Sequence, residues 1–342
     1  MKSSIYGLLP DELAGFCKEQ EQLVFRAKQI LDWLYAKRVA SFDEMKNLPA
    51  ALRCALAENF SIQSASIIEI SGNAGETQKL LMELADGELI EAVIIPSARR
   101  DRNTVCLSSQ VGCAFHCAFC ASGQKGKIRD LSAGEMIGEL MACANLLGER
   151  PDNVVFMGIG EPFDNYDETL RAVRIMNHAD GLGIGARRIT VSTCGVVPGI
   201  QKLSEEKIQI ELSVSLHAPD SEIRSALMPV NRRWPFNELL AACETYTEKT
   251  KRIITFEYTL IRNVNDSAAH AHTLADALKK FPCRVNLIPL SPVKEYTGER
   301  AETETMKTFL HILEKNGINT TFRDSKGSAL KAACGQLRSQ RI

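Results

Sequence analysis

The sequence predicts a mixed α/β protein whose main domain is a partial (β/α)6 barrel, preceded by a small helical domain and a β-hairpin. Two observations lead to this fold class. From Asn103 onward, short apolar runs alternate with amphipathic helical segments, whereas the earlier residues are first helical and then β-rich in pattern. Repeated strand-helix units place parallel strands inside and helices outside, in either a doubly wound sheet or a barrel. Six units favour an open barrel over a closed barrel of eight.

Residues 1–62 are expected to form the helical domain. Pro10-Asp11-Glu12 is a typical helix start, and the apolar residues between Phe25 and Tyr35 recur at helical spacing. Residues 63–96 are expected to form the hairpin linker, with the turn signal Asp86-Gly87 between strands at 79–84 and 89–95. The barrel domain is then expected to span residues 97–342.

Each barrel strand is followed by one predicted helix. The strands are expected at residues 104–108, 154–157, 188–192, 209–215, 253–260 and 284–288. The helices are expected at residues 132–147, 166–178, 197–204, 236–247, 266–279 and 302–315. Parallel strands bring their carboxyl ends to one edge, where barrel enzymes carry their sites.

Composition limits the possible partners and compartment. No stretch of about 18 apolar residues occurs, and the N-terminus lacks the apolar run of a signal peptide, so we expect a cytoplasmic protein with no membrane partner. The net charge of −1 gives no overall attraction to nucleic acid. Eleven cysteines in such a chain favour reduced thiols, metal ligands or catalytic groups over a disulfide framework.

Three of these cysteines have the spacing of a metal-binding loop. Cys113, Cys117 and Cys120 follow the first barrel strand as C-x3-C-x2-C. A closed structural zinc site needs four ligands, whereas a 4Fe-4S cluster held by three cysteines leaves one iron open to another ligand. The alternative is a structural zinc loop, whose fourth ligand would be His116, Cys106 or Cys143.

Polar or glycine-rich segments follow three more strands at the same edge. The candidate cofactor-binding residues there are Gly160, Glu161, Ser192, Ser215, Leu216 and His217. Taken singly, the glycine segment could be a simple tight turn and the histidine a packed core residue. Their shared position at strand ends favours cofactor binding.

The cysteine loop resembles that of the radical S-adenosylmethionine superfamily, in which the open iron binds the methionine moiety of the cofactor. Gly160-Glu161-Pro162 resembles the GEP motif of that superfamily, which meets the methionine amino group. A wider set of motifs is similar to the RlmN/Cfr family of adenine methyltransferases across nearly the whole chain. These motifs lie at residues 25–30, 106–113, 187–190, 215–219, 264–266 and 332–337.

The resemblance implies a protein-bound methyl group. Cys334 matches the cysteine that is methylated by one S-adenosylmethionine, and a second molecule supplies the radical that activates this methyl for addition to adenine. A radical route suits adenine C2 and C8, which are electron-poor carbons. Cys106 matches the cysteine that releases the product by forming a disulfide. Glu91 matches the carboxylate proposed as proton acceptor.

The resemblance also implies the cofactors and partners. These are one 4Fe-4S cluster, two S-adenosylmethionine molecules per turnover, 23S rRNA and tRNA as substrates, and an electron donor such as flavodoxin or ferredoxin. Pro162 favours the branch that methylates C2 over the Cfr branch that methylates C8. The sequence departs from the family pattern at two places. Ser291 replaces the usual cofactor-binding asparagine, and residues 97–102 hold two extra positions.

RNA contacts are expected from local basic clusters around the barrel mouth and from the N-terminal domain. The clusters are Arg99-Arg100, Lys125 with Lys127 and Arg129, Arg187-Arg188, Arg232-Arg233 and Lys251-Arg252. The target base must leave the RNA stack to reach the site, so we expect a wide opening. A remaining alternative is a non-catalytic RNA-binding protein with a structural metal site.

Overall fold

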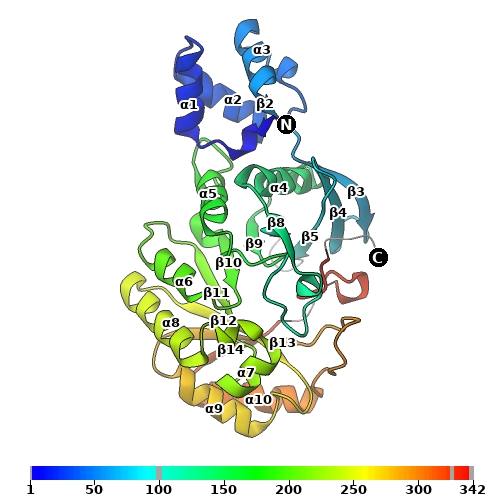
Figure 1. The fold of residues 1–342 in the computed structure, drawn as a ribbon, viewed down its shortest axis with the longest axis vertical. Helices are drawn as coiled ribbons and strands as arrows, with labels where there is room; N and C mark the ends of the chain where they lie inside the picture. The colour runs from blue at the N-terminus through cyan, green and yellow to red at the C-terminus, as the bar shows by residue number, and fades with distance from the viewer. Residues whose placement is uncertain (1, 98–101, 324–326, 339–342) are drawn as a thin grey trace.

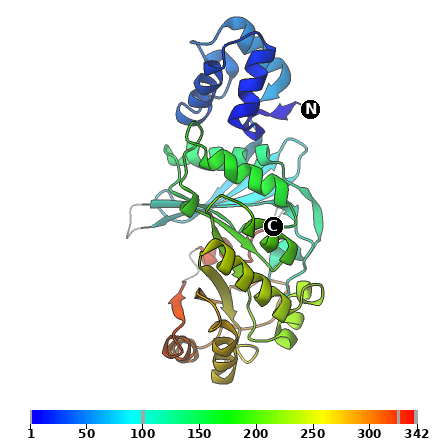
Figure 2. The ribbon, with the colours of Figure 1, turned by 90° about the vertical axis from the view of Figure 1, so that its left-hand side faces the viewer.

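The computed structural model describes residues 2–97, 102–323 and 327–338 (Figure 1). The molecule is elongated, with the N-terminal helices at one end and α9 (Ala268–Leu278) and α10 (Thr303–Lys315) at the other (Figures 1 and 2). The C-terminal segment returns to β5 (Leu89–Ser97), where the amide of Arg338 donates to the carboxylate of Glu91. Among the described residues, no helix is long and apolar enough to cross a membrane.

A ten-stranded sheet, in the order β14-β13-β12-β11-β10-β9-β6-β5-β4-β3, forms the centre of the molecule. All neighbours from β6 to β14 are parallel, and those from β3 to β6 are antiparallel. The parallel strands are β6 (Arg102–Leu107), β9 (Asn153–Phe156), β10 (Ile189–Thr193), β11 (Glu211–Ser215), β12 (Ile254–Leu260), β13 (Cys283–Pro289) and β14 (Asn319–Phe322). In the described part of the chain β14 and β3 do not pair, so the predicted partial barrel is confirmed and gains one strand, β14.

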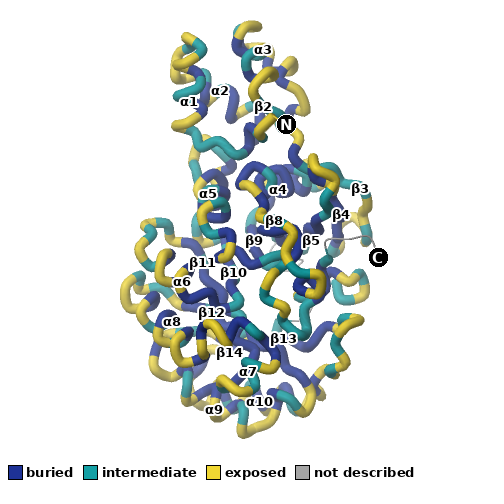
Figure 3. The backbone as a smooth tube through the Cα atoms, viewed as in Figure 1, coloured by how far each residue is buried: buried dark blue, intermediate teal, exposed yellow. Residues whose placement is uncertain are grey.

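Helices follow the strands as predicted. They are α4 (Ala133–Leu147), α5 (Tyr166–Asn177), α6 (Val197–Ser204), α8 (Phe236–Thr250), α9 (Ala268–Leu278) and α10 (Thr303–Lys315), with an additional short helix α7 (Ser221–Leu227). In α4, a capping box of Ser132 and Glu135 starts the helix, and Gly148 ends it in the left-handed conformation. The strands are largely buried and the outer helix turns exposed (Figure 3), so the apolar core lies between sheet and helices.

The predicted hairpin is confirmed in β4 (Gln78–Leu84) and β5 (Leu89–Ser97). A third strand, β3 (Ala65–Ser71), pairs with β4, and β5 pairs with β6. The hairpin is therefore continuous with the barrel sheet. The bounds of this linker, 63–96, stay a prediction.

The N-terminal residues form α1 (Pro10–Glu19), α2 (Phe25–Leu31) and α3 (Ala50–Asn59), with β1 (Ser3–Ser4) paired to β2 (Phe60–Ser61). The predicted helix start at Pro10 is confirmed. This part rests on α4 and α5, because Arg171 Nε donates to the carbonyl of Gly7 at 2.8 Å and Arg38 Nη2 donates to that of Gly148 at 2.7 Å.

Candidate functional site

The three predicted cluster cysteines lie on a loop closed by a small hairpin. Strands β7 (Gln110–Gly112) and β8 (Lys127–Asp130) pair antiparallel and flank the loop. Gly112 has φ +76°, and a side chain there would place Cβ 2.1 Å from the carbonyl oxygen of Gly126, so only glycine fits where the strand enters the loop. The amide of Ala118 donates to the carbonyl of Leu227 at 2.9 Å, which ties the loop to the end of α7.

The thiols of Cys113, Cys117 and Cys120 line one wall of a cavity at the carboxyl edge of the barrel. Burial raises the pKa of Cys113 to about 12 and that of Cys117 well above its usual value, so both thiols stay protonated near neutral pH until iron displaces the protons. The donor set fits a 4Fe-4S cluster, which takes its protein ligands from cysteine thiolates.

The structure gives the zinc alternative no fourth ligand beside the three cysteines. Among the described residues, no three His, Cys, Asp or Glu side chains are grouped as a preformed metal site, and this includes Cys113, Cys117 and Cys120, so the position of a fourth ligand has to separate zinc from a cluster. Of the proposed fourth ligands, Cys106 lines a different cavity and Cys143 is buried in α4. His116 has φ +49° and is exposed.

The polar residues predicted at the strand ends line the same cavity as the three cysteines. These are Gly160, Glu161, Ser192, Ser215 and His217, together with Ser291 after β13. Leu216 is fully buried and is not among the lining residues. Its backbone amide donates to the carbonyl of Glu257 at 3.1 Å. Leu216 therefore helps to fix the backbone between Ser215 and His217, and its side chain does not face the cavity.

Glu161 is held rigidly in the turn after β9. Its carboxylate accepts from the amides of Phe163 at 3.0 Å and Cys194 at 2.7 Å, and burial raises its pKa. The preceding Gly160 has φ +102°, and a Cβ there would lie 2.5 Å from that of Gln110. This buried carboxylate, facing a cavity, suits the binding of an ammonium group.

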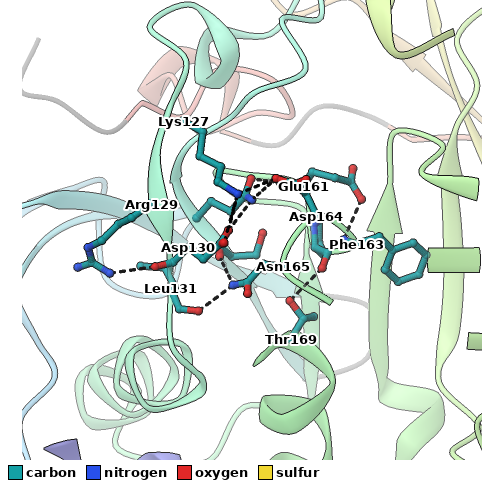
Figure 4. A network of polar contacts seen from close by, with 12 residues as sticks. Lys127, Arg129, Asp130, Leu131, Glu161, Phe163, Asp164, Asn165 and Thr169 are labelled. Atoms are coloured by element: carbon teal, nitrogen blue, oxygen red, sulfur yellow. Dashed lines mark hydrogen bonds and ion pairs between the residues drawn. The ribbon is translucent and has the colours of Figure 1, made fainter. Parts of the chain in front are cut away.

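A polar network joins this turn to the cluster hairpin (Figure 4). Lys127 on β8 forms ion pairs with Asp130 at 2.9 Å and Asp164 at 2.8 Å. The Gln110 amide group donates to both carboxylates, and its oxygen accepts from the amide of Glu161 at 2.8 Å. The network therefore fixes the cluster loop and the Glu161 turn in one geometry.

His217 is a neutral side chain facing the cavity. Its Nδ1 accepts from the amide of Thr259 at 2.9 Å, and its ring meets Phe119 edge to face at 4.9 Å. Burial lowers the pKa of His217 to about 3. Since Nδ1 is an acceptor, the neutral ring carries its proton on Nε2 and is left with a donor for a ligand.

The structure brings Cys334 and Cys106 together. Cys334 lines both the cluster cavity and an adjoining cavity, which Cys106 also lines. The amide of Ala121 donates to Gly335 at 2.7 Å, and Ser122 Oγ donates to Leu337 at 2.8 Å, so the C-terminal segment is fastened to the cluster loop. All eleven cysteines lie in the described part of the chain and are free thiols, so a lasting disulfide is not present.

Burial sets the protonation of these two thiols. It raises the pKa of Cys106 to about 12, with Cys334 adding to the shift. Desolvation by the surrounding protein also raises the pKa of the Cys334 thiol, and the nearby Arg323 guanidinium opposes this shift. The residue as a whole is exposed. Both sulfurs are therefore thiols near neutral pH.

Glu91 does not line either cavity. Its carboxylate is buried on β5, where it forms an ion pair with Lys79 at 2.8 Å and accepts from the amide of Arg338 at 2.6 Å. Burial raises its pKa, against the opposing effect of Lys79.

Among the residues of the cavity wall that sequence reasoning missed are Met157, Cys194, Glu257 and Arg323. Glu257 had a signal, because Thr255, Glu257 and Thr259 are alternate polar residues on an otherwise apolar strand, which indicates a polar inner face. The residues Arg99-Arg100 lie outside the described residues.

Comparisons with known proteins agree with this geometry. Residues 107–275 match the family model of the radical SAM superfamily, and residues 4–62 match that of the ribosomal RNA large subunit methyltransferase N-terminal domain. A probable dual-specificity RNA methyltransferase RlmN of Thermoanaerobacter sp. (strain X514) is 47% identical over 333 residues, covering 96% of this chain and 95% of that protein. A protein of the same description from Akkermansia muciniphila is 44% identical, covering 96% of this chain and 93% of that protein.

The fold is also that of a solved relative. The crystal structure of a radical SAM methyltransferase from Sphaerobacter thermophilus matches with a TM-score of 0.94 and 44% identity, over 99% of this chain and 100% of that one. This family membership sets aside the non-catalytic alternative. The chain belongs to the RlmN family of dual-specificity RNA methyltransferases, which are radical S-adenosylmethionine enzymes.

Proposed function

We propose that this enzyme methylates C2 of an adenosine in 23S rRNA and C2 of an adenosine in the tRNA anticodon arm, through a methyl group carried on Cys334. The observation that carries the proposal is the position of Cys334, which lies between the cavity of the three cluster cysteines and the cavity of Cys106. The names of the relatives, which describe dual-specificity RNA methyltransferases, support both RNA classes as substrates.

Cys113, Cys117 and Cys120 would hold the 4Fe-4S cluster, which when bound supplies the electron that cleaves S-adenosylmethionine. The strand-end residues would bind the cofactor. Glu161 offers a fixed carboxylate to the methionine amino group, and His217 offers an Nε2 proton. Ser192, Ser215 and Ser291 add hydroxyl groups to the same wall. We assign two cofactor molecules to each turnover, one for the methyl group and one for the radical.

The two remaining thiols have separate tasks. Cys334 loses its proton as its sulfur takes the methyl group. After this methyl group has given up a hydrogen atom to the radical, its carbon bonds to the adenine carbon and bridges the Cys334 sulfur and the RNA. Cys106 then attacks the Cys334 sulfur, which releases the methylated RNA and leaves a transient disulfide for an external reductant to reopen. Their shared cavity supports this pairing.

Glu91 is assigned as proton acceptor for the substrate carbon. In this conformation its carboxylate is engaged by Lys79 and by the amide of Arg338. Its use therefore requires the C-terminal segment around Arg338 to shift when RNA binds. A raised pKa suits a carboxyl group that accepts a proton near neutral pH.

Pro162 supports the C2 branch over C8 methylation. We place the reaction in the cytoplasm, with a flavodoxin-type or ferredoxin-type electron donor. The test is anaerobic reconstitution with a 23S rRNA fragment or tRNA, followed by mass spectrometry of the digested RNA. We expect 2-methyladenosine from wild type and no methylated base from Cys334→Ala. A product that is only 8-methyladenosine would overturn the proposal.

A further inference from the structure

The barrel interior on the side away from the strand carboxyl ends is polar. Closed eight-stranded barrels usually fill the corresponding space with branched apolar side chains. Here a cavity of about 720 Å³ occupies it. Its wall includes alternate residues of three neighbouring strands: Glu211 and Ser213 on β11, Thr255 and Glu257 on β12, and Arg284 and Asn286 on β13. We call this cavity the lumen.

The lumen opens at the amino ends of the strands. Its rim includes Arg187 just before β10, Gln209 just before β11 and Lys251 just before β12. The next residues inward on the same strands, Ser215 and Thr259, line the cluster cavity instead. The lumen and the cluster cavity therefore approach one another from opposite ends of the barrel.

The two cavities meet at shared residues. Met157, Glu257 and Arg323 line both the lumen and the cluster cavity. Met157 and Arg323 also line the cavity that holds Cys106 and Cys334. The inner end of the lumen is therefore next to the thiol that we assign as methyl carrier.

The lumen carries excess positive charge. Five basic residues line it against two acidic ones, namely Arg187, Lys251, Arg252, Arg284 and Arg323 against Glu211 and Glu257. Arg252 pairs with Glu211 at 2.5 Å, and Arg323 lies 3.7 Å from Glu257. Arg187, Lys251 and Arg284 are all exposed, and their side chains form no ion pair or hydrogen bond with another described residue.

A buried acceptor is left free at the inner end. Glu257 Oε1 accepts from Asn286 Nδ2 at 3.0 Å and from Ser213 Oγ at 3.5 Å. Its other oxygen, Oε2, is buried and has no hydrogen-bond partner among the described residues. A buried acceptor without a partner costs free energy, and a ligand that donates a hydrogen bond to it from an amino or hydroxyl group would remove that cost.

We propose that the lumen is the RNA entrance: an unstacked nucleotide enters from the amino ends of the strands, with its phosphates at Arg187, Lys251 and Arg284 and its donor groups toward Glu257. The volume is within the range of about 300–1,000 Å³ typical of ligand pockets. Cofactor and RNA then reach Cys334 from opposite sides. The inference rests on the proposed function, because it takes RNA as the substrate.

The test compares two double variants by RNA binding at several salt concentrations. Lys251→Ala/Arg284→Ala removes one lysine and one arginine from the lumen. The control, Lys294→Ala/Arg300→Ala, removes the same charges from the exposed loop after β13, at the strand carboxyl edge. Cluster content and thermal unfolding of both variants show whether they fold.

We expect the lumen variant to bind the substrate RNA about tenfold or more weakly, with a salt dependence reduced by about two counterions, and the control to bind like wild type. If wild type binds and methylates RNA while the lumen variant binds equally well, or the control alone is impaired, the entrance proposal is wrong and the proposed function stands. If wild type neither binds nor methylates RNA, both are wrong.

Discussion

At the scale of single residues, the site consists of buried polar groups with one side fixed by the fold and the other facing a cavity. Glu161 and His217 each use protein amides to fix their orientation. Such groups cost free energy to bury, and that cost is offset when a ligand uses the remaining donor or acceptor. Their arrangement therefore supports the proposal that the cofactor binds in a site already formed in its absence.

The buried neutral state of His217 predicts a pH dependence of stability. Its pKa is 6.5 in the unfolded chain and about 3 in the folded protein. When the pH falls below 7, His217 therefore becomes protonated in the unfolded chain but stays neutral in the folded protein. This proton binding stabilises the unfolded chain, so the free energy of unfolding falls. In His217→Asn, whose amide oxygen can still accept from Thr259, this contribution is gone.

Urea unfolding under anaerobic conditions at pH 7 and pH 4.5 checks this prediction. The stability difference between wild type and His217→Asn should shrink at the lower pH, while contributions from other titrating groups cancel in the comparison. A difference that stays constant between the two pH values would show that His217 is not buried as a neutral ring.

Residue roles could be predicted from sequence only where a motif carries them. The spacing of Cys113, Cys117 and Cys120, together with the family resemblance, predicts a cluster loop without any structure. Glu257 and Arg323 belong to no such motif. Their importance depends on strand register, which turns Glu257 inward beside Asn286, and on the return of the chain through β14 to place Arg323 beside it.

At the scale of elements, the site depends on contacts between segments far apart in sequence. The cluster loop touches α7 through Leu227 and the C-terminal segment through Gly335 and Leu337. Cys334, the proposed methyl carrier, therefore keeps its place because its own short segment is hydrogen-bonded to the loop that holds Cys113, Cys117 and Cys120.

Removal of one of these contacts should loosen the C-terminal segment. In Ser122→Ala the bond from Ser122 Oγ to the Leu337 carbonyl is lost, and we expect hydrogen exchange of residues 332–337 to accelerate by up to about tenfold, since one such bond contributes about 1 kcal/mol. Ser204→Ala, which removes a local bond to Gln201 on α6, is the control. If residues 332–337 exchange equally fast in wild type and in Ser122→Ala, the Ser122 hydrogen bond does not hold the C-terminal segment in place.

The elements themselves were predictable where their hydrophobic pattern was strong. The six strands and six helices expected from Asn103 onward are all present. The strand β14 was missed because Asn-Thr-Thr-Phe has little apolar content and is held by pairing with β13. Helix α7 was missed because its seven residues are too few for a clear helical period.

At the scale of the whole molecule, the two ends of the barrel differ in their side chains. The carboxyl edge carries the three loop cysteines and the strand-end residues that we propose bind the cofactor. The amino edge carries Arg187, Lys251 and Arg284, which form no ion pair with another described residue. The N-terminal helices rest on α4 and α5 at one end of the elongated molecule, where they extend the surface available to a large RNA (Figures 1 and 2).

The central claim is that Cys334 carries the methyl carbon to RNA. The most direct measurement loads the enzyme with carbon-13-labelled methyl from S-adenosylmethionine, removes the excess, and then runs a single turnover on RNA with reductant and unlabelled cofactor. We predict that the first equivalent of methylated adenosine contains carbon-13 and that Cys334→Ala neither retains the label nor methylates RNA. An unlabelled methyl carbon in the first equivalent would contradict the account.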